Sequence, residues 1–243
     1  MTAVFTLIAM MASSAAAPQA EDAAAKAQKV AALKVSLAAN QAALKSYTWT
    51  ETTEISMKGE VKKKEQKLCR YGADGKVQKT PIGDQPAPKQ EQSGGGGGRR
   101  GGGRMKEHVV EKKVGEIKDY MGQAAALVKE YVPPDKDKIQ AAQTAGNVSM
   151  KPDPSAGTAL LTVKDYFKPG DSLAIGLNMA AKALSSYDVT SYVEDPKDDQ
   201  VTLSVTFDRL PDGVSYPKQT VLDVKAKQIK VVTTNSGYAK NAQ

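Results

Sequence analysis

A series of short alternating runs fills the second half of the chain and limits the folds open to it. In the clearest run, apolar and polar side chains alternate over eight residues: Val201, Leu203, Val205 and Phe207 against Thr202, Ser204, Thr206 and Asp208. This period of two is typical of a strand with one buried and one solvated face. Similar runs occupy 159–167, 173–179, 187–193, 214–225 and 228–234. Because no long helix separates them, we predict one antiparallel sheet.

The first half of the chain adds a helix and further strands. Residues 21–45 are rich in Ala and nearly free of Gly and Pro, with apolar residues at helical spacing, which predicts a helix with one narrow apolar stripe. From residue 46 the period changes to two, and four bulky residues share one face: Tyr47, Trp49, Ile55 and Met57. Turns at Lys58-Gly59 and Asp74-Gly75 then separate predicted strands over 61–71 and 76–82.

Residues 83–104 differ from everything around them. They contain Pro86, Pro88 and two runs of glycine, with no apolar stripe to offset the entropy of ordering, so we predict a disordered linker. Apolar residues then recur every three to four positions over 105–131, which predicts a second helix ended by Pro133-Pro134, and a shorter helix over 135–145 follows. The sequence therefore predicts one α+β domain over 21–243, with a sheet and two or three helices, interrupted by the linker.

The first twenty residues have the pattern of a secretory signal peptide. An apolar core over 4–12 is followed by the small residues of 13–17, although residues 1–3 carry no positive charge. The core is too short, and too rich in Ser and Ala, for a membrane span. We expect residues 1–20 to be a removable leader and the protein to be exported, either periplasmic or secreted. An Ala-rich terminus without a role in export is the alternative.

Histidine and cysteine are nearly absent, which removes most catalytic chemistry. The chain of 243 residues has one His and one Cys. A zinc site needs several such ligands, and a serine or thiol nucleophile usually needs a histidine base. His108 could join Glu111 with Glu107 or Asp119 as metal ligands, but the predicted helix puts His108 and Glu111 on its polar flank. We expect no enzyme, no metal, no cofactor and, with Cys69 alone, no internal disulfide.

The linker carries a basic segment whose role has three interpretations. Arg99, Arg100 and Arg104 stand among glycines, in a chain with a net charge of +7 and a pI of about 9.2. Such segments contact RNA in other proteins, but the aromatic residues that usually accompany them are absent from 94–104. We therefore consider nucleic acid the least favoured partner, an anionic envelope polymer or lipid head group a better one, and an inert linker the simplest interpretation.

Several features together resemble the periplasmic lipoprotein-carrier superfamily. They are the leader, a long helix ending in Leu44-Lys45-Ser46-Tyr47, the strand with Trp49, and a terminal meander with Gly213-Val214-Ser215-Tyr216-Pro217. The resemblance covers about 23–78 and 185–238, and the Gly/Arg linker and the helix after it depart from it. Residues 69–81 and 234–238 are also similar to uncharacterised exported bacterial proteins, which bring no known activity.

The carrier resemblance implies a curved, half-barrel sheet whose concave side holds acyl chains under a lid of helices. On that basis we expect Trp49, Ile55, Met57, Leu203 and Phe207 to contact a lipid, a lipoprotein or another amphipathic ligand. Core packing is the alternative explanation of this apolar face. In that case the protein would be a structural or adaptor protein that binds envelope polymers or protein partners. The sequence does not specify the ligand or the oligomeric state.

Overall fold

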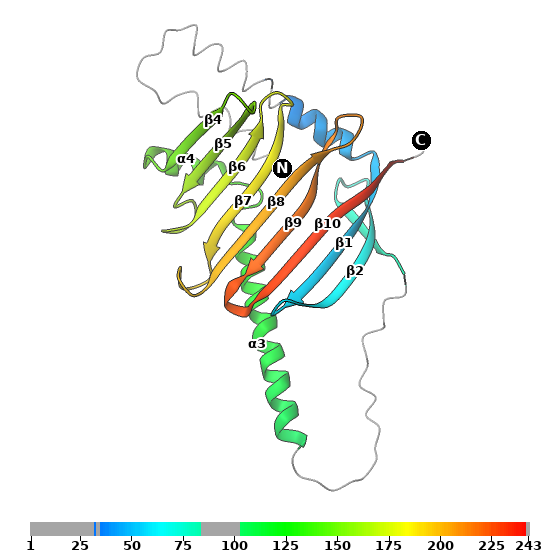
Figure 1. Cartoon of the computed structure of the whole chain (residues 1–243), viewed down its shortest axis with the longest axis vertical. Helices are drawn as coiled ribbons and strands as arrows, with labels where there is room; N and C mark the ends of the chain where they lie inside the picture. Colours follow the sequence, from blue (N-terminus) through cyan, green and yellow to red (C-terminus); the bar gives the residue numbers. More distant parts are fainter. Residues whose placement is uncertain (1–31, 33–34, 84–102, 242–243) are drawn as a thin grey trace.

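The computed structural model describes residue 32, residues 35–83 and residues 103–241. The predicted leader and residues 84–102 of the predicted linker lie outside them. The described residues form an α+β structure in which ten antiparallel strands make one open, curved sheet (Figure 1). The predicted fold class is therefore confirmed. The strands are β1 (Tyr47–Met57), β2 (Glu60–Tyr71), β3 (Val77–Pro81), β4 (Val148–Asp153), β5 (Thr158–Lys164), β6 (Ser172–Asn178), β7 (Ala183–Tyr192), β8 (Gln200–Arg209), β9 (Ser215–Val224) and β10 (Ile229–Lys240).

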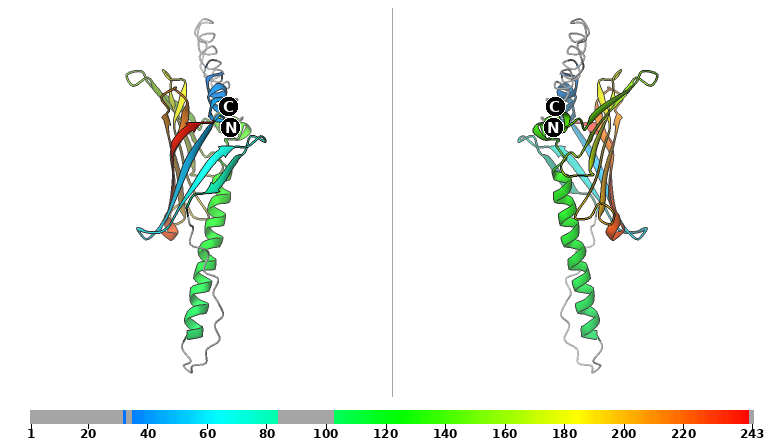
Figure 2. Two further views of the ribbon diagram at one scale, coloured as in Figure 1. Left: turned by 90° about the vertical axis from the view of Figure 1, so that its right-hand side faces the viewer. Right: turned by 90° about the vertical axis from the view of Figure 1, so that its left-hand side faces the viewer.

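In the described part of the chain, three α-helices cover one side of this sheet. They are a helix over 35–44, α3 (Gly103–Lys129) and α4 (Lys136–Thr144). Side views show the helices on the same side of the sheet, with part of α3 extending beyond the sheet edge (Figure 2). Buried residues from the second half of α3 and from α4, such as Leu127 and Ile139, join Leu173, Ile175 and Leu203 of the sheet in a single core cluster. We call the helix-covered side of the sheet its inner face.

The strand order places the two ends of the domain side by side. The order is β3-β2-β1-β10-β9-β8-β7-β6-β5-β4, so β1 pairs with β10, about 180 residues away in the chain. Every other neighbouring pair is also adjacent in sequence. The β1–β10 ladder runs from the pair Tyr47 and Lys240 to the pair Met57 and Ile229. This single long-range ladder joins the N-terminal hairpins to the C-terminal meander in one sheet.

One row of apolar side chains crosses the inner face from β1 to β4. Its members are paired strand to strand in the order Ile55, Val231, Leu222, Leu203, Val189, Leu173, Val163 and Val148. The neighbouring row changes character: Tyr187, Ile175 and Leu161 are apolar or aromatic, whereas Thr53, Thr233 and Thr220 are polar. Burying a large apolar side chain stabilises a fold by about 1.5–3 kcal/mol. The apolar row is therefore a major reason why helices cover this face.

Local signals account for the ends of the elements. Lys58 and Gly59 both have positive φ, 53° and 81°, as a tight hairpin between β1 and β2 requires. Asp135 caps α4, because its carboxylate accepts the backbone N–H groups of Asp137 at 2.7 Å and Lys138 at 3.4 Å. Gly146 follows that helix with a φ of 76°.

Two boundaries differ from the sequence predictions. Helix α3 begins at Gly103, so the backbone of Gly103 and Arg104, the last two residues of the predicted linker, belongs to the helix. The strand β4 was not predicted, because five of its six residues are exposed and no alternation marks it. A strand at the edge of a sheet needs less apolar sequence than a central one, since only one neighbour and one partly covered face hold it.

A polar contact links the first strand, the β8–β9 turn and the last strand. The Tyr47 hydroxyl donates to the carboxylate of Asp212, and Lys240 Nζ lies 3.0 Å from Asp212 Oδ2. The hydrogen bond from Tyr47, followed by the one from Lys240, lowers the pKa of Asp212 from 3.8 to about 2. Since the folded pKa is the lower one, this carboxylate stabilises the fold above about pH 4, and its contribution disappears as the pH falls through about 2.

We therefore predict that Asp212→Asn lowers the free energy of unfolding at neutral pH and reduces its pH dependence between about pH 4 and pH 2. Urea unfolding at a series of pH values, followed by circular dichroism, measures both quantities. If the variant loses stability toward acid as steeply as the unchanged protein over this range, the ionised Asp212 carboxylate does not stabilise the fold.

Candidate functional site

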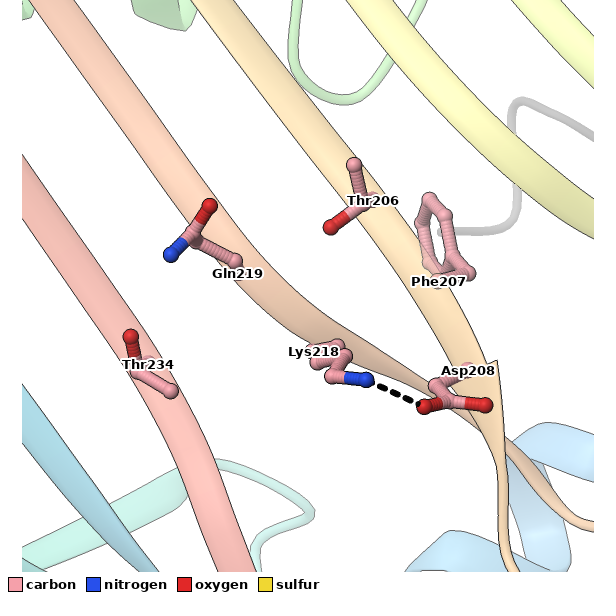
Figure 3. A pocket seen from close by; sticks show the side chains of 6 residues that line it. All are labelled: Thr206, Phe207, Asp208, Lys218, Gln219 and Thr234. Carbon is pink, nitrogen blue, oxygen red and sulfur yellow. Dashed lines mark hydrogen bonds and ion pairs between the residues drawn. The ribbon is translucent and has the colours of Figure 1, made fainter.

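Two hollows of similar size lie on opposite faces of the sheet. The first, of about 500 Å³, is on the outer face and is lined by Thr206, Phe207, Asp208, Lys218, Gln219 and Thr234 (Figure 3). Asp208 and Lys218 point toward each other there, with Lys218 Nζ 2.8 Å from Asp208 Oδ2. This pair satisfies both charges, and of the other lining residues only Phe207 is apolar. We do not regard this hollow as the functional site.

The second hollow, of about 440 Å³, lies on the inner face between the sheet and two helical segments. We call it the apolar cavity. The helix over 35–44 supplies Leu37, Asn40, Gln41 and Leu44, and the end of α3 with the turn after it supplies Val128, Val132, Pro133 and Pro134. Strands β7, β8 and β9 supply Leu184, Tyr187, Leu203, Val205, Phe207, Ser215, Pro217 and Thr220. None of these lining residues carries a charge, so the cavity suits an apolar group.

A buried hydrogen-bond network holds the wall formed by the end of α3. The Tyr187 hydroxyl donates to the Tyr131 carbonyl, and the Tyr131 hydroxyl donates to Asp171 and lies 2.8 Å from Ser191 Oγ. Tyr131 is fully buried, and Asp171 is only 2% exposed. These contacts tie Tyr131 to β7 and to the start of β6, next to the cavity residues Val132, Pro133 and Pro134.

The carboxylate of Asp171 is satisfied by backbone as well as by Tyr131. Its oxygens accept the N–H groups of Tyr166 at 2.6 Å, Phe167 at 3.0 Å and Lys168 at 2.9 Å. Hydrogen bonds from several donors offset the cost of removing a carboxylate from water. Burial, followed by the hydrogen bond to Asp171, raises the pKa of Tyr131 above its ordinary value. The Tyr131 hydroxyl therefore keeps its proton and remains a donor throughout the neutral range.

A second polar contact holds the opposite wall, the helix over 35–44. Asn40 Nδ2 donates to the Ser215 carbonyl at 2.7 Å, and the Ser215 N–H donates to Asn40 Oδ1 at 2.5 Å. One side chain of the helix thus uses both its donor and its acceptor on one residue of β9. This pairing fixes the position of the helix over the cavity, where Leu37 and Leu44 supply its apolar lining.

The structure separates the residues predicted to contact a ligand. Leu203 and Phe207 line the apolar cavity, whereas Trp49, Ile55 and Met57 are not among its lining residues. Ile55 and Met57 are half-buried and pack against the core cluster. Arg99 and Arg100 lie outside the described residues, and of Arg104 only the backbone is described.

Trp49 belongs to an aromatic cluster near one end of β1. It is 7% exposed, its ring stacks on Tyr238 with centroids 5.6 Å apart, and Tyr71 lies 5.5 Å away. Its indole N–H donates to Asn235 Oδ1 at 3.1 Å. Cys69, opposite Trp49 on β2, is fully buried, and burial raises the pKa of its thiol. These contacts support a packing role for Trp49.

Sequence reasoning missed most of the helical wall of the cavity. Alternation along β8 identified Leu203 and Phe207, but Asn40, Val132 and Pro134 come from other segments and meet the sheet only in the folded chain. The spacing of Leu37 and Leu44 in the predicted first helix was the one available signal. Nothing in the sequence indicates that Asn40 pairs with Ser215, 175 residues away.

Among the described residues, no group of three His, Cys, Asp or Glu side chains lies close enough together to hold a metal ion. No helix in the described part of the chain is long and apolar enough to cross a membrane. Comparison with models of protein families, with curated proteins and with solved structures gave no match to this chain.

We predict that Trp49→Ala lowers the free energy of unfolding by about 3–5 kcal/mol, because it removes a buried ring from a packed cluster. Trp49→Phe keeps a ring in the cluster and serves as the control, with a loss of about 2 kcal/mol or less. Trp49 is the only tryptophan, so urea unfolding is followed by circular dichroism rather than by fluorescence. A loss below about 1 kcal/mol for Trp49→Ala would contradict this packing role.

Proposed function

We propose that this protein binds the apolar part of an amphipathic molecule, such as a lipid acyl chain, in the apolar cavity. The observation that supports this most strongly is the uncharged and mostly apolar lining of a space of about 440 Å³ beneath the helices. Binding sites for small ligands commonly enclose about 300–1,000 Å³ with apolar walls and a few polar groups. The cavity has this size and composition, and Asn40, Gln41, Ser215 and Thr220 supply the polar groups.

The free energy gained by burying an acyl chain in the cavity is large enough to support binding. Each methylene group transferred from water to an apolar site contributes about 0.8 kcal/mol, so a chain of eight to ten carbons supplies several kcal/mol even after the cost of its own ordering. The two walls are held by polar contacts elsewhere, at Tyr131 and at Asn40. The cavity therefore does not need a ligand to keep its walls in place, which favours reversible binding.

The remaining functional expectations stay predictions. They are export to the periplasm or outside the cell, a lipoprotein as the natural partner, the absence of a catalytic role, and contact of the basic segment with an anionic polymer. The adaptor alternative requires a filled inner face. The packed cluster around Trp49 fits that alternative, whereas the space next to Leu203 and Phe207 favours ligand binding.

We predict that Thr220→Trp prevents binding by filling the cavity. Thr220 lines the cavity from β9, while its neighbour Gln219 lies on the outer face of the same strand. Diphenylhexatriene, a hydrocarbon that fluoresces in apolar surroundings, should bind the unchanged protein, and its affinity should fall at least about tenfold in Thr220→Trp. Gln219→Trp should bind the probe as before, and circular dichroism checks the fold of both variants.

Two results would contradict the proposal. One is a lack of probe binding to the unchanged protein below the concentration at which the probe aggregates. The other is an equal loss of affinity in Thr220→Trp and Gln219→Trp, since only the first substitution reaches the apolar cavity.

A further inference from the structure

The apolar cavity contains one polar group whose hydrogen bonding is incomplete. Ser215 lines the cavity and is 6% exposed, and among the described residues its Oγ is the one buried side-chain oxygen or nitrogen without a hydrogen-bond partner. Its backbone N–H and carbonyl are both taken by Asn40. Buried hydroxyl groups are normally paired, because an unpaired one loses its hydrogen bond to water without replacement.

The Ser215 side chain can turn without breaking any bond. A serine side chain has three staggered positions about the Cα–Cβ bond. Since Oγ makes no hydrogen bond in its present position, a turn toward an acceptor in the cavity breaks none. Two other polar side chains of the lining already make hydrogen bonds: Asn40 is held by the Ser215 backbone, and the Tyr187 hydroxyl donates to the Tyr131 carbonyl. Ser215 differs from the remaining polar residues, Gln41 and Thr220, because its hydroxyl is both buried and unpaired.

We propose that Ser215 sets the ligand specificity of the apolar cavity, by donating a hydrogen bond to an uncharged oxygen acceptor of the ligand. The ligand class is then an acyl ester or acyl amide, whose carbonyl is held by Ser215 and whose chain lies against Leu203, Val205 and Phe207. This inference rests on the proposed function and names its substrate class.

The absence of charge in the lining argues against a free fatty acid. A carboxylate inside the cavity would need a cation or several donors, and the lining residues include no Lys, Arg or His. One hydroxyl is enough for an ester carbonyl, because this group carries no charge and a single hydrogen bond pairs its oxygen. The carbonyl also lies at the end of an acyl chain, so one molecule can satisfy Ser215 and fill the apolar space together.

The test measures displacement of diphenylhexatriene by methyl decanoate and by decanoate in the unchanged protein and two variants. Ser215→Ala removes the hydroxyl with little change in shape. Ser204→Ala is the matched control, because Ser204 lies on the outer face of β8, where its hydroxyl donates to Asp188 at 2.6 Å. At a pH of about 8 decanoate is fully ionised, so the two displacing molecules differ mainly in charge.

We expect methyl decanoate to bind the unchanged protein at least about tenfold more tightly than decanoate does. Ser215→Ala should lower the affinity for methyl decanoate roughly 3- to 10-fold and leave the affinity for the hydrocarbon probe unchanged. Ser204→Ala should change neither affinity. Because Ser215 Oγ is buried without a partner, Ser215→Ala should unfold at the same temperature as the unchanged protein or at a higher one.

Three results would overturn the inference while leaving the proposed function intact. They are unchanged ester binding in Ser215→Ala, an equal loss of ester and probe binding, and decanoate binding as tightly as the ester. Failure of the proposed function is a different result, because the unchanged protein would then not bind the hydrocarbon probe at all.

Discussion

The hydrogen bond between Tyr131 and the buried carboxylate of Asp171 determines where the helical cover meets the sheet. Asp171 is held by three backbone N–H groups of the loop between β5 and β6, so its position is set by the sheet. Tyr131 follows the end of α3 and brings that end to Asp171 and Ser191. Without a donor at this point, a nearly inaccessible carboxylate would lose part of its hydrogen bonding. The position of Val132, Pro133 and Pro134, and so one wall of the cavity, depends on this contact.

The inner face of the sheet has two chemically different halves. From β4 to β8 it is apolar and covered by α3 and α4, as Leu161, Ile175 and Leu203 show. Toward β1 and β2 it carries charges: Glu65 pairs with Lys63 and with Lys67 at 3.0 Å, and Glu51 pairs with Lys79 at 2.7 Å. Charged side chains that pair in this way need no apolar cover. The apolar cavity lies between the two regions and is lined by Leu203, Val205 and Phe207 of β8 and by Pro217 and Thr220 of β9.

The sequence predicted the elements better than their arrangement. Strict alternation identified β8 with its inward residues Leu203 and Phe207, and the Asp-Gly and Lys-Gly pairs marked the hairpin turns of the first three strands. These signals are local, because each depends on a few adjacent residues. The pairing of β1 with β10 could not be predicted in this way, since it joins residues far apart in the chain.

The difference between local signals and long-range contacts also explains why only some of the predicted ligand-contacting residues line the cavity. The alternation of β1 predicted that Trp49 and Ile55 share one face, but it does not show what covers that face. The cover proved to be Tyr238 and Tyr71 over Trp49, and helical residues over Leu203. The unpartnered hydroxyl of Ser215 is a property of the packed structure and has no sequence signal.

The most direct test of the central claim, that the apolar cavity holds an amphipathic molecule, is native mass spectrometry of protein purified from its own host without added lipid. The account predicts a fraction of protein with a discrete excess mass, which denaturing conditions release as a molecule containing an acyl chain. Protein that carries no excess mass, and that gains none after incubation with acyl esters, would contradict it.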